Sequence, residues 1–405
     1  MPSFDCDVLV IGAGPAGSAA ARTLALAGRK VVLADQHRFP RDKVCGDALI
    51  PDAHAALRRL GLLDAVMAQA QSVSAVGCIG PRGGRIDVPG ELAVLPRLQL
   101  DQILCRGAAD AGAVLAMPAR FMSLIEEDGR VVGAQFQTAD APRAVRAPWV
   151  ILATGAVPQP LIAAGMCERH TPSGVALRGY VKNDAMVGRI GALEIVWHRA
   201  LRPGYGWIFP CRDGVFNIGV GLSNSHSEEA GGRGQKRDVN LRAVFDDFVR
   251  SYAPAADLML GGELMGALKG APLRCSLEGA RLTRPGLMVT GEAAGSTYSF
   301  TGEGIGKALE TGIHAAEAVL AGDLLAGDDA AVRADYEARL LALKPRFALY
   351  ERANKVNRHP WLADLLIWRG NKSARILKRM SGVLDETSNP GNLVTVKGLV
   401  RLFTE

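Results

Sequence analysis

The sequence predicts an α/β protein that combines a Rossmann-like nucleotide-binding domain, an antiparallel β-sheet substrate domain and a C-terminal helical tail. Three observations predict this fold class. An apolar run at residues 7–11 leads into a glycine-rich turn and an alanine-rich stretch, residues 174–265 contain segments of alternating side-chain character, and the basic C-terminal part carries Trp and Leu at helical spacing. Alternation with a period of two is typical of strands, and an apolar stripe with a period of 3.6 is typical of helices.

The composition is that of a globular protein. The chain has 405 residues, of which 48% are hydrophobic and 22% charged, with a formal net charge of +6. This length predicts two or three domains, and the apolar content excludes a disordered chain. No run of about 20 apolar residues is present, so we expect no membrane-spanning helix. Asp5 and Asp7 give the N-terminus the wrong charge for a secretion signal, and the sequence therefore predicts a cytoplasmic protein.

The first functional element is the glycine-rich turn at residues 12–17. It follows a short buried-type strand and precedes a helix, and a second apolar strand ends at Asp35, 18 residues after Gly17. In this β-α-β arrangement Gly12 permits the tight turn, Gly14 lets a pyrophosphate approach the backbone, and Gly17 lets the helix pack on the strand. Asp35 can accept hydrogen bonds from ribose hydroxyls. The combination predicts a dinucleotide site.

A distant segment decides which dinucleotide binds, because the N-terminal motif suits NAD and FAD equally. Residues 287–295 form a short apolar strand that ends in small residues, and residues 301–305 lead into a helical stretch. Backbone amides at such a helix N-terminus can hold the electron-rich pyrimidine edge of a flavin. The two ends of the chain together therefore predict FAD.

Six segments of the chain resemble the geranylgeranyl reductase family. This family is a branch of the FAD-dependent oxidoreductases with the p-hydroxybenzoate hydroxylase fold, which also includes aromatic monooxygenases and flavin-dependent halogenases. The resemblance covers roughly residues 5–325, and the segments that carry it are 12–17, 39–47, 176–180, 204–210, 291–295 and 301–305.

The resemblance implies roles for individual residues. Arg41 and the turn at residues 45–47 would lie beside the flavin, Arg97 would reach the cofactor from the start of a helix, and Glu292, where the family usually has Asp, would bond the ribityl chain. The complete set of residues expected to contact FAD is Gly12, Ala13, Gly14, Ala16, Gly17, Asp35, Arg41, Cys45, Gly46, Arg97, Gly155, Gly291, Glu292, Gly302, Gly304 and Ile305.

Three departures from related families narrow the reaction. Residues 153–158 lack the Asp-Gly pair of the NADPH-using aromatic hydroxylases. Halogenases of this fold carry two tryptophans and a lysine, whereas Tyr205 replaces the first tryptophan here and residues 69–85 contain no lysine. Ser299 and Phe300 stand where the family has a proline before the loop at residues 301–305. The first two differences argue against a hydroxylase and a halogenase and so favour a reductase, whereas the third changes the wall expected at the re-face of the flavin.

The substrate side is predicted between residues 174 and 265. Tyr205, Trp207 and Phe209 alternate along one strand and therefore share one face, which would either form an aromatic wall of the substrate pocket or pack in a core. Residues 223–240 form a long polar loop. Reduction of a carbon–carbon double bond needs a hydride donor and a proton donor on opposite sides. Cys45 and Asp47 are the candidates for the catalytic acid, and the neighbouring Lys43 and Arg41 predict a depressed pKa for the Cys45 thiol.

The basic excess lies in the tail. Residues 340–405 contain 12 Lys and Arg against 5 Asp and Glu. The helical segment around Trp361 and Trp368 either packs its Trp and Leu face on the body or lies on anionic lipid at the inner face of the membrane. No recognition motif for nucleic acid accompanies the charge, and the seven scattered cysteines and seven histidines show no metal-ligand spacing, so neither nucleic acid nor metal is expected.

The sequence thus predicts an FAD-dependent oxidoreductase that reduces double bonds of an isoprenoid or another hydrophobic small molecule. NAD(P)H or a reduced carrier would supply the electrons. The alternatives are a monooxygenase or halogenase of a biosynthetic pathway, and an electron-transfer flavoprotein that docks a redox partner through its tail. The expected division places residues 1–70, 96–160 and 275–325 in the FAD-binding domain, residues 71–95 and 161–274 in the sheet domain, and residues 326–405 in the tail.

Overall fold

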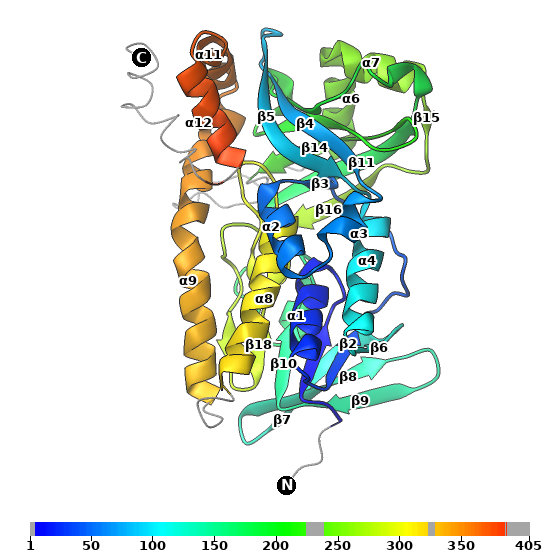
Figure 1. Ribbon diagram of the computed structural model, residues 1–405, viewed down its shortest axis with the longest axis vertical. Coiled ribbons are helices and arrows are strands. Elements are labelled where there is room, and N and C mark those ends of the chain that lie inside the picture. Colours follow the sequence, from blue (N-terminus) through cyan, green and yellow to red (C-terminus); the bar gives the residue numbers. More distant parts are fainter. Residues whose placement is uncertain (1–4, 224–238, 323–328, 385, 387–405) are drawn as a thin grey trace.

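Two sheets are stacked along the long axis of the molecule (Figure 1). The computed structural model describes residues 5–223, 239–322, 329–384 and 386. The sheet nearer the N-terminus is mostly parallel, the other is mostly antiparallel, and helices of the C-terminal region run beside both (Figure 1). The fold class predicted from the sequence is confirmed.

A six-stranded sheet forms the nucleotide-binding half. All neighbouring strands in it are parallel except the first pair, β17 and β18. In spatial order the strands are β17 (Thr283–Arg284), β18 (Leu287–Val289), β10 (Trp149–Leu152), β1 (Val8–Ile11), β2 (Val31–Ala34) and β6 (Val114–Ala116).

Both faces of this sheet are covered, which explains why β1 is apolar throughout. Val8 and Val10 pack against the helices on one face, and Leu9 and Ile11 pack toward a three-stranded sheet on the other. A strand that is buried on both sides loses the polar and apolar alternation of a half-exposed strand. The covering elements are α1 (Pro15–Leu26), α4 (Arg97–Asp110), α8 (Ile305–Gly322) and the strands β7 (Arg120–Glu127), β8 (Arg130–Gln137) and β9 (Pro142–Arg146).

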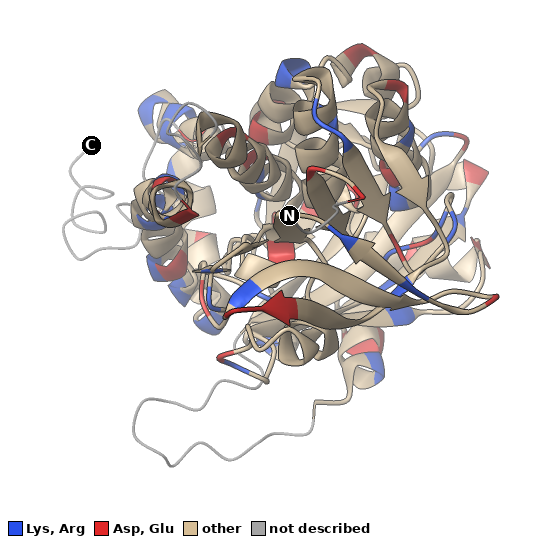
Figure 2. Ribbon diagram, turned by 90° about the horizontal axis from the view of Figure 1, so that it is seen from below, with Lys and Arg blue, Asp and Glu red and all other residues tan. Residues whose placement is uncertain are grey.

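Small residues let α1 and α8 approach each other closely. A Cβ atom on Gly312 of α8 would lie 2.1 Å from the backbone oxygen of Ala16 in α1, so only glycine fits there. The long helix α9 (Asp329–Ala353) lies beside α8, and the Tyr336 hydroxyl donates to the backbone oxygen of Val289 at 2.7 Å. Helix α9 has an acid, Asp329, in its first turn and a base, Arg352, in its last, and the ribbon seen from the N-terminal end carries both basic and acidic positions (Figure 2).

The second sheet has nine strands and is antiparallel except between β12 and β4. Strands of the two other sheets lie between these two strands in the chain, so no hairpin joins them. The strands are β15 (Glu263–Leu264), β11 (Gly174–Lys182), β14 (Val215–Ser223), β13 (Gly204–Pro210), β12 (Leu193–Val196), β4 (Gln71–Ile79), β5 (Arg85–Val94) and β3 (Ala48–Leu49) in spatial order, with β16 (Lys269–Leu273) paired to β11.

One face of the nine-stranded sheet packs on α6 (Leu241–Ser251) and α7 (Ala253–Leu260), and the other turns toward the nucleotide-binding half. The remaining helices of the described chain connect these layers. They are α2 (Pro51–Arg59), α3 (Leu63–Met67), α5 (Pro158–Ala163), α10 (Lys355–Arg358), α11 (Trp361–Gly370), α12 (Ala374–Leu384) and the 3-10 turns η1 (Asp184–Met186), η2 (Arg199–Leu201) and η3 (Gly291–Ala294).

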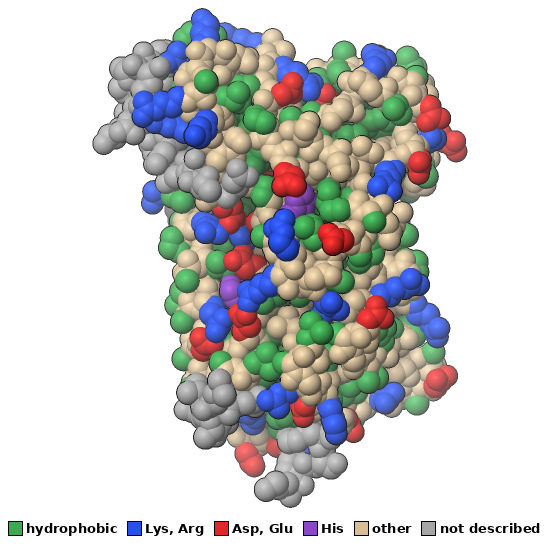
Figure 3. Space-filling model, viewed as in Figure 1, with side chains coloured by type: hydrophobic (Ala, Val, Ile, Leu, Met, Phe, Trp, Pro, Cys, Tyr) green, Lys and Arg blue, Asp and Glu red, His purple; other side chains and the backbone are tan. Residues whose placement is uncertain are grey.

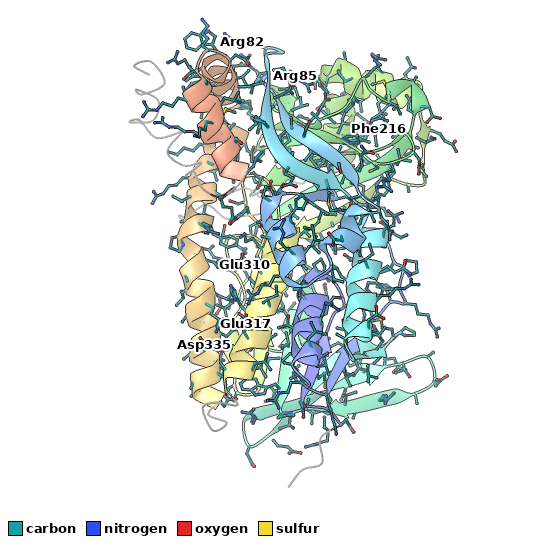
Figure 4. All side chains as sticks on the ribbon, viewed as in Figure 1. Arg82, Arg85, Phe216, Glu310, Glu317 and Asp335 are labelled. Carbon is teal, nitrogen blue, oxygen red and sulfur yellow. The ribbon has the colours of Figure 1, made fainter. Side chains whose placement is uncertain are left out.

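The helices α11 and α12 dock on the β4–β5 hairpin. Asp364 in α11 accepts a hydrogen bond from the backbone amide of Arg82 at 3.1 Å, and Asn371 donates to the backbone oxygen of Arg85 at 2.8 Å. Figure 4 shows both arginines at the α11 end of the molecule. The buried Leu362 and Ile367 complete the contact. Of the two alternatives for the tail, packing on the body is therefore correct for the aliphatic side chains of α11.

Part of the predicted polar loop and of the tail lies outside the described residues, namely residues 224–238 and 387–405. Among the helices that are described, none is both long and apolar enough to cross a membrane. Within the same residues no cluster of three or more His, Cys, Asp or Glu side chains could hold a metal ion.

Candidate active site

A cavity of about 770 Å³ lies between the two sheets. At one end it reaches the carboxyl end of β1 and the turn that follows it, at Ile11, Gly12 and Gly14. Its middle runs under the nine-stranded sheet, and its other end is bounded by Leu366 and Met380 from α11 and α12. Ligands of α/β proteins bind at the carboxyl ends of parallel strands, and the first end has this position.

Close backbone contacts shape the turn after β1. Gly12 has a φ of +103°, and a Cβ atom there would lie 2.3 Å from the backbone oxygen of Ala153. A Cβ atom on Gly17 would lie 1.7 Å from the backbone oxygen of Gly12, so helix and turn can pack only without side chains. The amide of Ala13 donates to Asp35 Oδ2 at 2.8 Å. Asp35 therefore holds the turn as well as bordering the cavity.

The space in front of Gly14 suits a diphosphate. A Cβ atom on Gly14 would meet only guanidinium nitrogens, Arg41 Nη2 at 3.7 Å and Arg97 Nη2 at 4.0 Å. Both arginines share the buried carboxylate of Asp101, which Arg97 binds through Nε and Nη2 at 2.6 and 2.7 Å and Arg41 through Nη1 at 2.8 Å. Two positive charges against one negative charge leave an excess for an anion. The residues present thus fit the diphosphate of a dinucleotide.

The loop at residues 41–47 and the start of α8 line the middle of the cavity. Most of the residues expected to contact FAD border it, as do all three aromatic residues of the predicted wall. Those that do are Gly12, Gly14, Ala16, Asp35, Arg41, Cys45, Gly46, Arg97, Gly155, Glu292, Gly302, Gly304, Ile305, Tyr205, Trp207 and Phe209. Ala13, Gly17 and Gly291 lie just behind the wall, where Gly17 and Gly291 allow close packing.

Asp47 is fixed by side chains of the nine-stranded sheet. Its backbone has a φ of +67°, which is rare outside glycine. Its carboxylate accepts hydrogen bonds from the Tyr180 hydroxyl and, at 2.7 Å, from Asn217 Nδ2, which also donates to the Cys45 backbone oxygen at 2.8 Å. Burial raises the pKa of Asp47 to about 6, although these hydrogen bonds oppose the shift. Asp47 therefore holds a proton in mildly acidic conditions.

Three residues that hold this loop were not among the predicted site residues. Arg178 donates to Asp42 Oδ1 at 2.7 Å and to the backbone oxygen of Lys43 at 2.9 Å, and its guanidinium lies over the Tyr180 ring. Asn217 is the third. The sequence did contain a signal for Asn217, because it is a polar residue within an otherwise apolar and glycine-containing strand. A polar side chain that is buried in such a strand needs a hydrogen-bond partner.

The expectation of a depressed pKa for Cys45 is wrong. Burial raises the pKa of this thiol, and the nearby charge of Arg97 does not offset the loss of water. The cations close in sequence are engaged elsewhere, because Lys43 lies 3.9 Å from Glu292 and Arg41 binds Asp101. Cys45 is therefore a protonated thiol at neutral pH, suited to donate a proton rather than to act as a thiolate.

Glu303 is a further cavity residue that the sequence did not single out. It lies in the loop before α8, and its Oε2 accepts a hydrogen bond from Thr301 Oγ1 at 3.1 Å. Burial, reinforced by the negative charge of Asp52, raises the pKa of Glu303 to about 8. Lys307, which is 2% exposed, lies 3.6 Å from Asp52 and partly balances the cluster. A carboxyl group that is neutral at pH 7 thus borders the cavity.

The aromatic residues of β13 both line the cavity and pack in the core, which were the two alternatives expected for them. Trp207 and Phe209 are buried among core residues and also face the cavity, with their ring centroids 6.3 Å apart. Tyr205 donates its hydroxyl hydrogen to the backbone oxygen of Thr301 and so ties the sheet to the loop before α8. The wall continues as apolar side chains toward α11 and α12.

Comparisons with known proteins identify the family and the cofactor of this chain. Residues 5–176 match the model of the FAD binding domain. The menaquinone reductase of Mycolicibacterium smegmatis is 33% identical over 351 residues, which cover 78% of this chain and 76% of that protein. The digeranylgeranylglycerophospholipid reductase of Methanosarcina mazei is 31% identical over 331 residues, covering 78% and 77%. The dinucleotide of this site is therefore FAD.

Solved structures share the fold over nearly the whole chain. A geranylgeranyl bacteriochlorophyll reductase-like protein from Thermoplasma acidophilum aligns with a TM-score of 0.72 at 24% identity, covering 99% of this chain and 96% of that one. A flavin-dependent brominase aligns with the same TM-score at 19% identity, covering 98% and 97%. At these identities the likeness concerns the fold alone.

Replacing Gly14 by valine should yield a folded protein without FAD. The Cβ atom of the new valine would lie at least 3.7 Å from every protein atom around it, so the fold can accept it. The side chain would, however, occupy the place of the diphosphate. The measurement is the flavin absorbance of the purified variant together with its thermal unfolding in the FAD-free form. Gly191→Val, at a position with open space around it, is the control and should stay yellow. Stoichiometric FAD in the Gly14 variant would contradict the site.

Glu303 should make the FAD-free protein less stable as the pH rises. An acid whose pKa is about 8 when folded and about 4.5 when unfolded keeps its proton in the folded chain between these values, so unfolding releases a proton. The stability from this group is present below pH 4.5 and is lost as the pH rises to 8. Glu303→Gln should flatten the dependence of the unfolding temperature on pH in this window, whereas Glu263→Gln, at an exposed position, should not. If the unfolding temperatures of the wild type and of the Glu303 variant changed equally with pH, Glu303 would have an ordinary pKa in the folded protein.

Proposed function

We propose that this chain, which belongs to the geranylgeranyl reductase family of FAD-dependent oxidoreductases, reduces carbon–carbon double bonds of an isoprenoid or another extended hydrophobic molecule. One observation carries the proposal. The cavity continues without interruption from the diphosphate end, past Cys45 and Trp207, to an apolar end between β5 and the helices α11 and α12. A long apolar chain would remove this lining from water, whereas a small polar substrate would leave it uncovered.

The chain's own residues divide the work along the cavity. Arg41, Arg97 and the amides near Gly14 bind the diphosphate, and Asp35 lies where a ribose would. FAD, when bound, supplies the hydride. The start of α8 offers backbone amides to the electron-rich edge of the flavin, since the first amides of a helix have no partner within it. Tyr205, Trp207 and Phe209 orient the hydrophobic substrate and exclude water.

The proton comes from the turn at residues 45–47. The Cys45 thiol is protonated at neutral pH and borders the cavity, so it can donate to the carbon that does not receive hydride. Asp47 lies behind it, and its amide donates to Cys45 Sγ at 3.4 Å. With a pKa of about 6, the Asp47 carboxyl is the second group of the turn that exchanges protons near neutral pH.

The relatives' names support the same chemical class. Menaquinones and digeranylgeranylglycerophospholipids both carry polyprenyl chains, so an isoprenoid is the substrate class that the two groups share. NAD(P)H or a reduced carrier protein is the proposed source of electrons. A monooxygenase or halogenase would need oxygen for its reaction, which gives a direct distinction.

The purified protein, once its FAD has been reduced with dithionite under anaerobic conditions, should be reoxidised by a polyprenyl substrate. Each turnover should add two hydrogen atoms to the product, which mass spectrometry would detect. A fully saturated analogue is the control and should leave the flavin reduced. Conversion that occurs only in the presence of oxygen, with oxygen or halogen in the product, would overturn the reductase proposal.

Cys45→Ser should lower the rate of double-bond reduction by about 100-fold while FAD stays bound, because a serine hydroxyl is a much weaker acid than a thiol. Single-turnover oxidation of the reduced flavin measures the effect. Cys167→Ser is the matched control, since Cys167 is partly exposed and lies away from the cavity. An unchanged rate in the Cys45 variant would remove this thiol from the mechanism.

A further inference from the structure

The outward face of α11 and α12 is strongly basic. Between Trp361 and Leu384 the chain has five Lys and Arg residues and one acid, Asp364. The acid turns inward, where it accepts a hydrogen bond from the Arg82 amide and has a side chain that is only 17% exposed. Basic side chains gather over these helices in the space-filling view (Figure 3), whereas the opposite end of the molecule mixes both signs (Figure 2).

Two tryptophans lie on the same face as this charge. Trp361 is 57% exposed and Trp368 is 45% exposed, and their spacing of seven residues places both on one side of α11. The Arg369 guanidinium and the Lys372 ammonium lie 5.7 and 4.7 Å from the Trp368 ring centre. Indole rings flanked by cations are typical of the interface between lipid headgroups and acyl chains.

The inner faces of the same helices belong to the cavity wall. Leu366 and Ile367 of α11 and Met380, Val383 and Leu384 of α12 line its apolar end. The α11–α12 pair therefore separates the apolar end of the cavity from the basic, tryptophan-bearing surface. A hydrophobic molecule that leaves a bilayer at this surface needs to pass only these two helices to reach the aromatic wall.

We propose that the outward face of α11 and α12 docks on an anionic lipid bilayer and that the substrate enters the cavity along the inner faces of these helices. Basic residues complement anionic headgroups, and exposed indole rings flanked by cations match the interface of a bilayer, whereas the charge alone would also suit an acidic protein. The docking concerns the surface itself, whereas the entry route rests on the proposed reductase function.

Sedimentation with vesicles tests the docking. The full-length FAD-loaded protein should sediment with vesicles of phosphatidylglycerol and phosphatidylcholine and much less with vesicles of phosphatidylcholine alone. The triple variant Lys372→Glu, Arg375→Glu, Lys378→Glu should bind the anionic vesicles about 100-fold more weakly. The control reverses three exposed basic residues elsewhere, Lys30→Glu, Arg106→Glu and Arg143→Glu, and should bind as the wild type does.

Tryptophan fluorescence supplies a second readout. Brominated lipids should quench the emission of the wild type on anionic vesicles, and Trp361→Phe with Trp368→Phe should remove most of that quenching. The docking proposal would be overturned if the wild-type protein did not sediment with anionic vesicles. It would also be overturned if the triple variant sedimented with them as well as the wild type does. Weakening by the control variant to the same extent would also overturn it, because the effect would then be one of net charge.

Turnover separates docking from chemistry. The triple variant should reduce a polyprenyl substrate in detergent micelles at the wild-type rate and the same substrate in anionic vesicles much more slowly. Equal rates from vesicles would overturn the entry route. Protein that binds vesicles but reduces no substrate in either form would support the docking and contradict the proposed function.

Discussion

A single buried carboxylate organises the cofactor end of this protein. Asp101 is fully buried and binds both Arg41 and Arg97, and an Nη2 nitrogen of each arginine borders the space in front of Gly14. The buried guanidinium of Arg97 and the partly buried one of Arg41 would repel each other without it, and a buried ion that loses its partner costs about 3–5 kcal/mol. The carboxylate also sets the charge balance, since it leaves one positive charge for the diphosphate. This ion pair joins α4 to the loop at residues 41–47, beside the hydrogen bonds that the Arg97 amide donates to Asp47 Oδ1 and the Leu95 amide donates to the Asp47 backbone oxygen.

The second constraint is that the nine-stranded sheet fixes the loop on which the chemistry depends. Arg178, Tyr180 and Asn217 come from β11 and β14, and each of them bonds a group of residues 42–47. Asp47 keeps an unusual backbone conformation because these bonds satisfy its carboxylate and the neighbouring carbonyl groups. The two sheets therefore meet through hydrogen bonds at the centre of the cavity as well as through apolar packing around it. A shift of the substrate sheet would move Cys45 and Asp47 with it.

The C-terminal helices give the cavity its length. Without α11 and α12 the space under β4 and β5 would be open to water, and its apolar lining would favour collapse or aggregation over substrate binding. Asp364, Asn371 and Ser381 attach the helices to the hairpin through its backbone. Other side chains of the inner faces, Leu366, Met380 and Val383, line the cavity and can contact a substrate. The same two helices carry the basic surface. Substrate length and access are thus both properties of this region.

The sequence by itself determined the nucleotide-binding half. Strand, glycine turn, helix and acid follow one another within 35 residues, and each residue type is required by backbone geometry that is local, as at Gly12 and Gly17. The alternation of Tyr205, Trp207 and Phe209 likewise predicted a shared face. Only the tertiary structure decided the ionisation of the site, because the pKa values of Cys45 and Glu303 depend on burial and on charges brought from distant segments. It also decided that the aliphatic face of α11 packs inward while its two tryptophans remain at the surface, since helical spacing shows which residues share a face but not what that face meets.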